Sequence, residues 1–336
     1  MKYRCAIVGA SGYTGLELVK ILLQHPHFEL VYLGGSEGGE RIDEVYPALR
    51  GLCDLPIQKT DVQQIIQECD LAFLALPHKS AMEVAKPLVE GGVKVVDLSA
   101  DYRLQLENYE AFYTKHTDTK HLKKAVYGLP EIYRKKIAKA KLVANPGCYP
   151  TAALLAAIPF VPYIDKEFPI IIDAKSGVSG AGKACKPNTH YVKINENLFA
   201  YSPIKHRHSI EIKEKLEILG NETYEIDFVP HLVPLSRGML VSIYARLSSD
   251  IDPIELLQDI YADEPFIRIR TEPVDVKSVA GTHYCDIFAM RNGRTLFISS
   301  AIDNLLRGAS SQAVANANLM MGIDEATALP TIPYIP

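Results

Sequence analysis

A cysteine that directly follows a Pro-Gly turn is the residue of this sequence best placed to do chemistry. The strand-like segment Lys141–Ala144 ends shortly before Pro146-Gly147, Cys148 comes next, and an Ala/Leu-rich segment, Ala152–Ile158, follows. A strand, a tight turn and then a helix place the thiol near a helix N-terminus, where unpaired backbone N–H groups and the helix dipole stabilise a thiolate. We therefore predict that Cys148 is a nucleophile.

A glycine-rich loop near the N-terminus predicts a dinucleotide site. The loop lies between a strand-like segment, Tyr3–Val8, and a helical segment, Thr14–Gln24, and its glycines have the spacing G-x-x-G-x-x-G. Glycines at this spacing permit a tight turn and let a pyrophosphate approach the helix N-terminus. The residues predicted to contact the cofactor are Gly9, Ser11, Gly12, Tyr13, Thr14 and Gly15.

The residues after the second strand bear on the choice between NAD and NADP. An acidic residue at the strand end usually binds the ribose 2′-hydroxyl of NAD, and none directly follows Glu29–Leu33. Ser36 can donate a hydrogen bond to a 2′-phosphate and Arg41 can supply positive charge, whereas Glu37 argues weakly for NAD. We expect NADP.

A cationic stretch, Lys205–Ile212, contains two histidines. A histidine near the thiol can serve as acid or base in covalent catalysis. Residues two apart point to opposite sides of an extended segment, so we expect only one of His206 and His208 to face a shared site. A solvated basic turn before the helix Ile210–Leu219 is the alternative.

Other polar residues follow predicted strands, where ligands bind in open α/β sheets. Arg103 comes after Val93–Leu98 and can hold a carboxylate or phosphate, or else form a surface salt bridge with Asp101. Pro77 ends the third strand and is predicted to line the cofactor. The small-residue loop Ser176–Lys183 has many backbone N–H groups and can cradle an anion.

Together these groups indicate one chemistry. A thiolate attacks an activated acyl carbon and forms a thioester, which hydride from a nicotinamide reduces through a thiohemiacetal to an aldehyde. The helix N-terminus favours the thiolate and helps to stabilise the oxyanion. If the leaving group is phosphate, Arg103 is the residue that can bind it.

Composition excludes several classes of function. The 336 residues carry a formal net charge of −4, which gives no basic footprint for nucleic acid. No apolar run is long enough to span a bilayer, and Met1–Arg4 leads into a strand without a signal-peptide pattern, so we expect a cytoplasmic protein. The six cysteines form no CxxC pair, so we predict neither a disulfide framework nor a metal site.

The order and spacing of the apolar segments predict two domains of the α/β class. Strands and helices alternate in the first half, which predicts a Rossmann-type, doubly wound parallel sheet. The second half reads as an α+β domain with a mainly antiparallel sheet, and a strand, Thr295–Ala301, then precedes a long helix, Asp303–Met321. The other strands predicted in the second half are Phe168–Ala174, Tyr224–Pro230, Leu240–Leu247 and Ile267–Arg270, with a helix at Pro253–Tyr261.

Seven motifs, in order along nearly the whole chain, resemble those of the N-acetyl-γ-glutamyl-phosphate reductase family of arginine biosynthesis, in the aspartate-semialdehyde dehydrogenase-like superfamily. The pairing of ANPGCYPT with HRHSIEI is highly specific for this family. The motifs are Gly9–Gly15 (GASGYTG), Leu98–Leu104 (LSADYRL), Tyr127–Glu131 (YGLPE), Ala144–Thr151 (ANPGCYPT), Ser176–Lys183 (SGVSGAGK), His206–Ile212 (HRHSIEI) and Ile302–Leu305 (IDNL).

The resemblance implies roles for these residues. Cys148 is the nucleophile and the histidine pair supplies the acid and base, with His208 favoured as the base because it directly precedes the helix that carries Glu211. The resemblance places Ser179, Gly180 and Asn304 at the cofactor, with Asn304 near the nicotinamide. The residues that it assigns to the substrate are Arg103, Asn145, Ser176, Gly177, Tyr201 and Lys205.

The resemblance also implies how the chain is organised. The C-terminal helix returns to the dinucleotide-binding domain, which then comprises residues 1–147 and 303–336, and residues 148–302 form an inserted catalytic and oligomerisation domain. Family members are homo-oligomers, dimers or tetramers, and use NADP. Many carry an arginine for the 2′-phosphate where this chain has Gly35, and this weakens the expectation of NADP without reversing it.

Three alternatives remain open from the sequence. Aspartate-semialdehyde dehydrogenase uses the same thioester chemistry but has different cysteine and histidine motifs. A reductase of carrier-protein-linked aminoadipyl or glutamyl phosphate shares most of the motifs and needs a basic surface for its acidic carrier. A cofactor-binding regulatory protein without turnover is disfavoured by an intact Cys148 beside His206 and His208.

Overall fold

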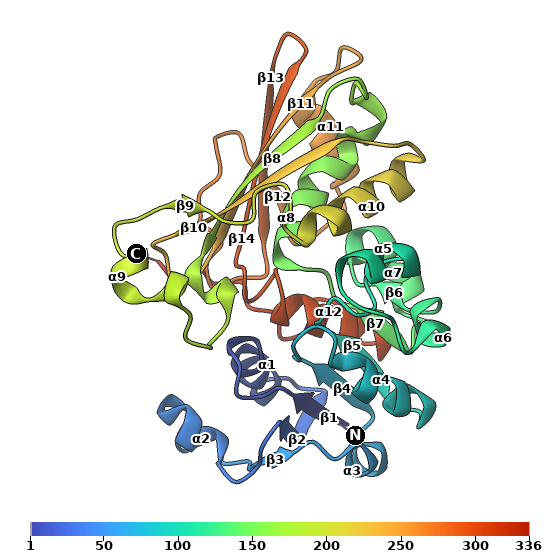
Figure 1. Ribbon diagram of the computed structural model, residues 1–336, viewed down its shortest axis with the longest axis vertical. Coiled ribbons are helices and arrows are strands. Elements are labelled where there is room, and N and C mark those ends of the chain that lie inside the picture. The colour runs from blue at the N-terminus through green and yellow to red at the C-terminus, as the bar shows by residue number, and fades with distance from the viewer. Residues whose placement is uncertain (1, 336) are drawn as a thin grey trace. The chain divides into compact units, whose positions relative to one another are not determined.

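Parallel strands joined by helices form the first unit of the protein. Within residues 2–335, which the computed structural model describes, this unit comprises residues 2–147 and 309–330. Its described strands pair in parallel in the order β3-β2-β1-β4-β5-β7-β6 (Figure 1). They are β1 (Tyr3–Val8), β2 (Phe28–Gly35), β3 (Ile57–Lys59), β4 (Leu71–Leu74), β5 (Lys94–Asp97), β6 (Val126–Tyr127) and β7 (Leu142–Ala144).

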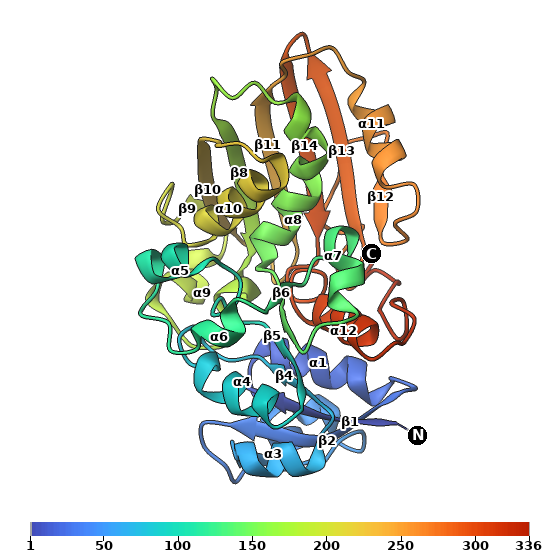
Figure 2. The same cartoon turned by 90° about the vertical axis from the view of Figure 1, so that its right-hand side faces the viewer.

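Helices cover both faces of this sheet. The helix α1 (Tyr13–Leu23) packs on β1 and β2, and α4 (Ala81–Glu90) packs on β5 (Figure 2). The order of the strands reverses direction between β1 and β4, so right-handed crossovers place α1 and α4 on opposite faces. The other helices are α2 (Ile42–Val45), α3 (Val62–Glu68), α5 (Leu106–Phe112), α6 (Thr119–Leu122), α7 (Pro130–Ile137), α12 (Ser310–Met320) and the 3₁₀ helix η1 (Pro47–Leu49).

Burial on both faces explains the composition of the central strands. Leu71, Ala72, Phe73 and Leu74 of β4 are all fully buried, as a strand of a parallel sheet covered on both sides must be. The prediction of a doubly wound parallel sheet is therefore confirmed.

A mixed sheet forms the second unit, which contains residues 148–308 and 331–335 among those described. Its strand order is β12-β13-β14-β11-β8-β10-β9. The central strands β8, β11, β14 and β13 pair antiparallel, whereas β8–β10 and β12–β13 pair in parallel. The strands are β8 (Ile170–Gly177), β9 (Phe199–Ala200), β10 (Ile226–Val233), β11 (Met239–Arg246), β12 (Ile267–Ile269), β13 (Cys285–Asn292) and β14 (Thr295–Ile302).

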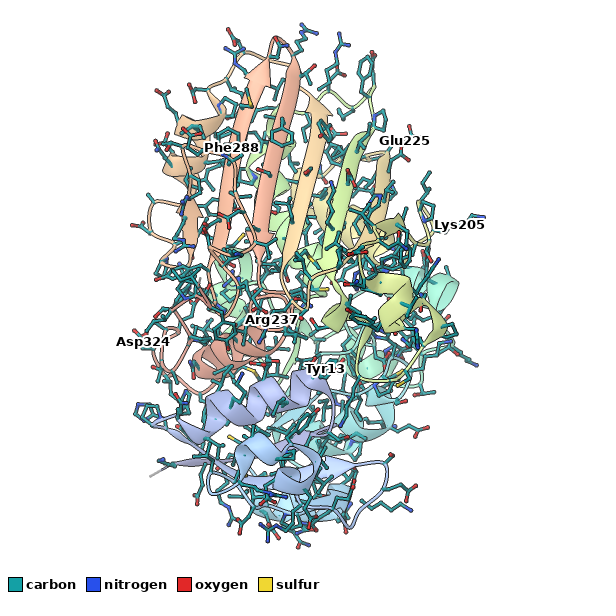
Figure 3. All side chains as sticks on the ribbon, turned by 90° about the vertical axis from the view of Figure 1, so that its left-hand side faces the viewer. Tyr13, Lys205, Glu225, Arg237, Phe288 and Asp324 are labelled. Atoms are coloured by element: carbon teal, nitrogen blue, oxygen red, sulfur yellow. The ribbon has the colours of Figure 1, made fainter. Side chains whose placement is uncertain are left out.

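The longer helices of the second unit cover one face of this sheet. Figure 2 shows α8, α10 and α11 on that face, and Figure 3 looks onto the opposite face, where the strands stand uncovered. The prediction of a second, mainly antiparallel α+β domain is confirmed, although β13 was not predicted. The helices are α8 (Cys148–Ala157), α9 (Tyr191–Ile194), α10 (His208–Gly220), α11 (Pro253–Ile260), η2 (Ile158–Tyr163), η3 (Val178–Ala181) and η4 (Pro187–Thr189).

The segment before α12 corrects one prediction. The sequence predicts a helix from Asp303, but the helix begins at Ser310. The Asp303 carboxylate accepts hydrogen bonds from the N–H groups of Leu305 (2.9 Å) and Leu306 (3.0 Å) and so forms a turn. Side chains of this type compete with helical hydrogen bonds when they bind nearby backbone N–H groups.

The same segment sets the boundary between the units. Residues 303–308 and 331–335 lie in the second unit, whereas the sequence places the return to the first domain at residue 303. Asp303 also pairs with Arg237 (3.0 Å), and the Tyr334 N–H donates to the Ala280 carbonyl (2.8 Å). These bonds to residues of the second unit explain where the division falls.

Candidate active site

Cys148 is the first residue of α8. It is half-buried, and every following residue of the helix, Tyr149–Ala157, is buried. The helix packs against β11, β14 and α10, which explains why it is apolar all round. The first N–H groups of a helix have no acceptor within it, so the thiol lies at the positive end of a helix that its surroundings hold fixed.

The turn before α12 lies directly against Cys148. A Cβ atom added to Gly308 would come within 2.7 Å of the Cys148 Cβ and 2.6 Å of the Asn304 carbonyl oxygen. Only glycine fits at that position without movement of the turn or of the cysteine. Gly308 is a site residue that sequence reasoning missed, because its role depends on a contact 160 positions away in the chain.

A small-residue loop after β8 adjoins the same turn. Asn304 donates from Nδ2 to the Ser179 hydroxyl (3.0 Å) and accepts at Oδ1 from the Gly238 N–H (2.6 Å). A Cβ added to Gly180 would lie 3.0 Å from the Ser176 hydroxyl and 3.5 Å from Asn304. Gly177 is equally constrained, since a Cβ there would meet the backbone of Arg237 at 2.9 Å. The structure thus brings together the predicted residues Ser176, Gly177, Ser179, Gly180 and Asn304.

Tyr149 is the centre of an aromatic cluster beside the nucleophile. Its ring lies 5.8 Å from the rings of both His206 and His208. Its hydroxyl donates to the His231 carbonyl (3.2 Å) and accepts from the Tyr201 hydroxyl (3.2 Å). Burial raises the pKa of the Tyr149 phenol and raises the pKa of Tyr201 to about 12, so both phenols stay protonated at neutral pH.

The two histidines share one environment, which corrects a second prediction. The expectation that they face opposite sides assumed an extended segment, but α10 begins at His208. The rings lie only 4.9 Å apart, and both contact Tyr149. The helical turn therefore brings together side chains that an extended chain would separate.

His206 is held as a neutral imidazole. Its Nδ1 atom accepts a hydrogen bond from the His208 backbone N–H (3.1 Å), which assigns the proton of the neutral ring to Nε2. Burial, with a smaller contribution from Arg207, lowers the pKa of His206 to about 4. His206 is therefore a hydrogen-bond donor at neutral pH. Lys205, by contrast, is exposed.

The predicted glycine loop has the geometry of an anion site in the first unit. Gly9 has a φ of +93°, and a Cβ there would come within 2.3 Å of the Ala75 carbonyl oxygen. Gly15 is packed as tightly, whereas a Cβ on Gly12 would meet nothing closer than 3.6 Å. No described side chain caps α1. These residues fit a bound pyrophosphate, because the first turn of the helix offers donors beside an open glycine.

The neighbouring residues of the loop are held from both sides. The Tyr46 hydroxyl donates to the Ser11 carbonyl (2.7 Å), and the Ser310 hydroxyl donates to the Thr14 carbonyl (3.0 Å). Tyr13 opens α1 and is half-buried, whereas Pro77 after β4 is exposed.

The end of β2 presents a cation that sequence reasoning missed. Ser36 is exposed, as predicted for a 2′-phosphate contact, but the Arg41 guanidinium is engaged by the Asp43 carboxylate (2.7 and 3.0 Å). Lys59, at the end of β3, pairs in register with Gly35 and is exposed. Many family members carry an arginine at the position of Gly35. The pairing of β2 with β3 brings Lys59 beside that position in this chain.

Arg103 is buried, with much of its guanidinium already bound. Its Nε donates to the Asn145 carbonyl (2.8 Å) and its Nη2 to the Leu98 carbonyl (2.6 Å). Asn145 is also buried, accepts from Asn316 at its side-chain oxygen (3.0 Å) and donates to the Ala309 carbonyl (3.2 Å). Arg103 therefore joins the residues that follow β5 and β7, and Asn145 joins the end of β7 to Ala309 and α12. The predicted contact of both residues with substrate stays a prediction.

Two further observations concern metals and membranes. Among residues 2–335, no group of three or more histidine, cysteine, aspartate or glutamate side chains is arranged to hold a metal ion. In the same range no helix has the length and apolar character that crossing a membrane requires.

Comparison with known proteins decides the family. The chain is 58% identical over 333 residues to the N-acetyl-gamma-glutamyl-phosphate reductase of Sulfurovum sp., with 99% of each chain covered. It is also 58% identical to the enzyme of that name from Wolinella succinogenes, over 100% of this chain and 99% of the relative. The chain belongs to the N-acetyl-gamma-glutamyl-phosphate reductase family.

Membership of the N-acetyl-gamma-glutamyl-phosphate reductase family confirms the predicted resemblance and makes the chain an oxidoreductase. Residues 4–140 match the semialdehyde dehydrogenase NAD binding domain, and residues 148–304 match the semialdehyde dehydrogenase dimerisation domain. Solved structures agree in fold. Aspartate semialdehyde dehydrogenase II from Vibrio cholerae superimposes with a TM-score of 0.73 at 17% identity, covering 96% of this chain and 99% of that one. The Candida albicans enzyme, solved with NADP, gives a TM-score of 0.70 at 15% identity, covering 96% and 99%.

We predict that Gly308→Ala damages the site of this reductase. The added methyl group must displace either the Asn304 carbonyl or Cys148, and a nucleophile misplaced by about 1 Å can lose roughly a hundredfold in rate. We expect kcat to fall at least about tenfold and alkylation of Cys148 to slow, as measured by steady-state kinetics and peptide mass spectrometry. The control is Gly293→Asn, because a Cβ there meets nothing within 4 Å and asparagine tolerates the left-handed backbone of this position (φ +57°). Unchanged kcat and alkylation in Gly308→Ala would contradict the contact.

Proposed function

We propose that this protein reduces N-acetyl-γ-glutamyl phosphate to N-acetylglutamate semialdehyde and phosphate, with NADPH, in arginine biosynthesis. The observation that carries the proposal is Cys148 at the start of α8, beside the ring cluster of Tyr149, His206 and His208. Relatives at 58% identity that bear the name of this reductase favour it over aspartate-semialdehyde dehydrogenase, since the Vibrio cholerae enzyme of that name is only 17% identical to this chain.

Cys148 performs the acyl transfer in this proposal. Its thiolate attacks the acyl carbon, the carbon–oxygen bond to the phosphate breaks, and the thioester and free phosphate result. Backbone N–H groups at the start of α8 stabilise the negative charge that develops on the acyl oxygen. Bound NADPH supplies the hydride that reduces the thioester carbonyl. The resulting thiohemiacetal then releases the aldehyde and regenerates the thiol.

Cys148→Ser tests this role. A serine hydroxyl is a far weaker nucleophile than a thiolate at neutral pH, so we expect loss of phosphate-dependent NADP reduction with N-acetylglutamate semialdehyde. NADP binding, measured by calorimetry, should persist. The matched control is Cys185→Ser, which removes an exposed thiol and should keep full activity. Full activity in Cys148→Ser would exclude the thioester mechanism.

We assign different roles to the two histidines. The Nδ1 atom of His206 already accepts a backbone N–H, so protonation there would break that hydrogen bond. His206 therefore acts as a donor from Nε2 and helps to bind the acyl oxygen. His208, which is buried at the start of α10, serves as the base that takes the proton of the Cys148 thiol.

The pH–rate profile distinguishes these roles. The pKa of His206 is lowered to about 4, so this ring stays neutral as the pH falls through 6.5 and gains a proton only near pH 4. We expect His206→Asn to lower kcat without moving the acid limb that belongs to the base. His208→Asn should remove that limb. If only His206→Asn removes it, the two roles must be exchanged.

We propose NADP as the cofactor, with Ser36 and Lys59 at its 2′-phosphate. Both side chains are exposed at the carboxyl ends of β2 and β3, where Arg41 is engaged by Asp43. A lysine ammonium binds phosphate as a point charge, and no acid directly follows β2 to bind a ribose hydroxyl instead.

Lys59→Ala should therefore change the preference between NADP and NAD. Loss of one charge-assisted contact is worth about 1.5–3 kcal/mol, so kcat/KM for NADP should fall roughly tenfold to a hundredfold while that for NAD stays the same. Lys115→Ala, which removes another exposed lysine, should change neither value. An equal loss with both dinucleotides in Lys59→Ala would reject the assignment.

We further propose that two copies pair through the uncovered face of the second sheet (Figure 3). Ile171, Tyr244 and Met290 on this face are 42%, 43% and 52% exposed, and Tyr244 contacts the ring of Phe297 at 5.4 Å. Strands β8, β11, β14 and β13 place these side chains in register. A contiguous apolar patch of this kind marks an interaction surface, and the matched family description is that of a dimerisation domain.

Tyr244→Glu tests the pairing, because each of the two copies would then bring a negative charge to the centre of the interface. We expect the wild-type protein to have at least the mass of a dimer by light scattering, and the variant to be a monomer. Leu52→Glu, at a 68% exposed position of the first unit, should leave the mass unchanged. A monomeric wild-type protein, or a variant that still pairs, would show that this face is not the interface.

A further inference from the structure

Six lysines surround one cavity of the first unit, away from the residues assigned above. The cavity has a volume of about 970 Å³ and lies among α4, α6, α7, β6 and β7. Glu90 is the one carboxylate among its described lining residues. The lysines are Lys120, Lys124, Lys135, Lys136, Lys139 and Lys141, and we refer to this feature as the lysine cavity.

Most of these charges are not neutralised by the protein. Lys124, Lys135, Lys139 and Lys141 form no ion pair with any residue in the described range, and Lys120 lies 3.4 Å from Glu90. The helix dipole explains cations in the last turn of α7, such as Lys135, but not those that precede or follow the helix. Like charges collected around one hollow create a positive potential that attracts anions, in a chain whose net charge is negative.

The lysine cavity lies at the opposite edge of the sheet from the dinucleotide loop. Val126 and Leu142, which line it, stand at the amino ends of β6 and β7, whereas Gly9 follows the carboxyl end of β1. All of these strands run in the same direction. The cavity is therefore separate from the site assigned to the cofactor, and from the sheet edge to which a carrier would have to deliver a substrate for reduction.

The lining defines the chemistry of the ligand. Lysine ammoniums bind phosphate oxygens as point charges, and several in one hollow suit a chain of phosphates. Apolar side chains of Val89, Val126 and Leu142 offer a surface for an uncharged part. The volume falls in the range of about 300–1,000 Å³ that is typical of small-molecule sites. We propose that the lysine cavity binds a small molecule with a triphosphate chain, either a nucleoside triphosphate or inorganic tripolyphosphate.

Calorimetric titration of the full-length protein with ATP and with tripolyphosphate tests this site. NADP and NAD are both present in excess, so that the dinucleotide site is filled. The test variant is Lys124→Gln/Lys139→Gln/Lys141→Gln. Its control, Lys2→Gln/Lys115→Gln/Lys277→Gln, removes the same charge at exposed positions elsewhere. We expect saturable binding, weakened roughly tenfold or more in the test variant and unchanged in the control.

A second variant tests the sign of the charge effect. Glu90→Gln removes the carboxylate of the cavity and should tighten binding several-fold. Tighter binding of ATP than of tripolyphosphate would identify a nucleotide, and equal binding would identify the phosphate chain alone as the recognised group. Binding that is equally strong in the two triple variants would overturn the proposal. So would the absence of binding of both probes at about 1 mM, the result expected if an acidic protein were the partner instead.

Discussion

The position of Cys148 as the first residue of α8 is the constraint on which the rest of the site depends. A thiol gains from a helix N-terminus only if the helix cannot move, and α8 is buried along its length between the second sheet and α10. The turn that contains Gly308 packs directly against the Cys148 side chain and so limits where the thiol can lie. The aromatic cluster around Tyr149 takes its position from the same helix, because Tyr149 is the next residue.

Buried polar groups hold the residues around this helix in place. The Asp303 carboxylate accepts bonds from Leu305, Leu306 and Gly281 and pairs with Arg237, and Asn304 joins the Gly238 backbone to Ser179. The side chains of Asp303 and Asn304 are themselves buried, so loss of a partner would leave a polar atom of either residue unsatisfied. Asn145 and Arg103 do the same at the end of β7 in the first unit.

Local patterns were enough to predict part of this structure. The glycine spacing of Gly9–Gly15 predicts the start of α1, and the order Pro146-Gly147-Cys148 predicts the start of α8. In both places the turn residues themselves determine the backbone. Contacts between distant segments decided the rest. The Asp303 carboxylate, which forms the turn before α12, also binds Arg237 and Gly281. His206 contacts the same ring as His208 because α10 begins at His208. Lys59 reaches the end of β2 only through strand pairing, which the sequence alone does not reveal.

The central claim is that the substrate acyl group resides on Cys148 between loss of phosphate and gain of hydride. Rapid acid quench of the protein with N-acetyl-γ-glutamyl phosphate, in the absence of NADPH, followed by peptide mass spectrometry, tests it most directly. We expect an N-acetylglutamyl adduct on the peptide that contains Cys148, and its disappearance when NADPH is added before the quench. Turnover without any adduct at Cys148, or an adduct on another residue that NADPH removes, would contradict the claim.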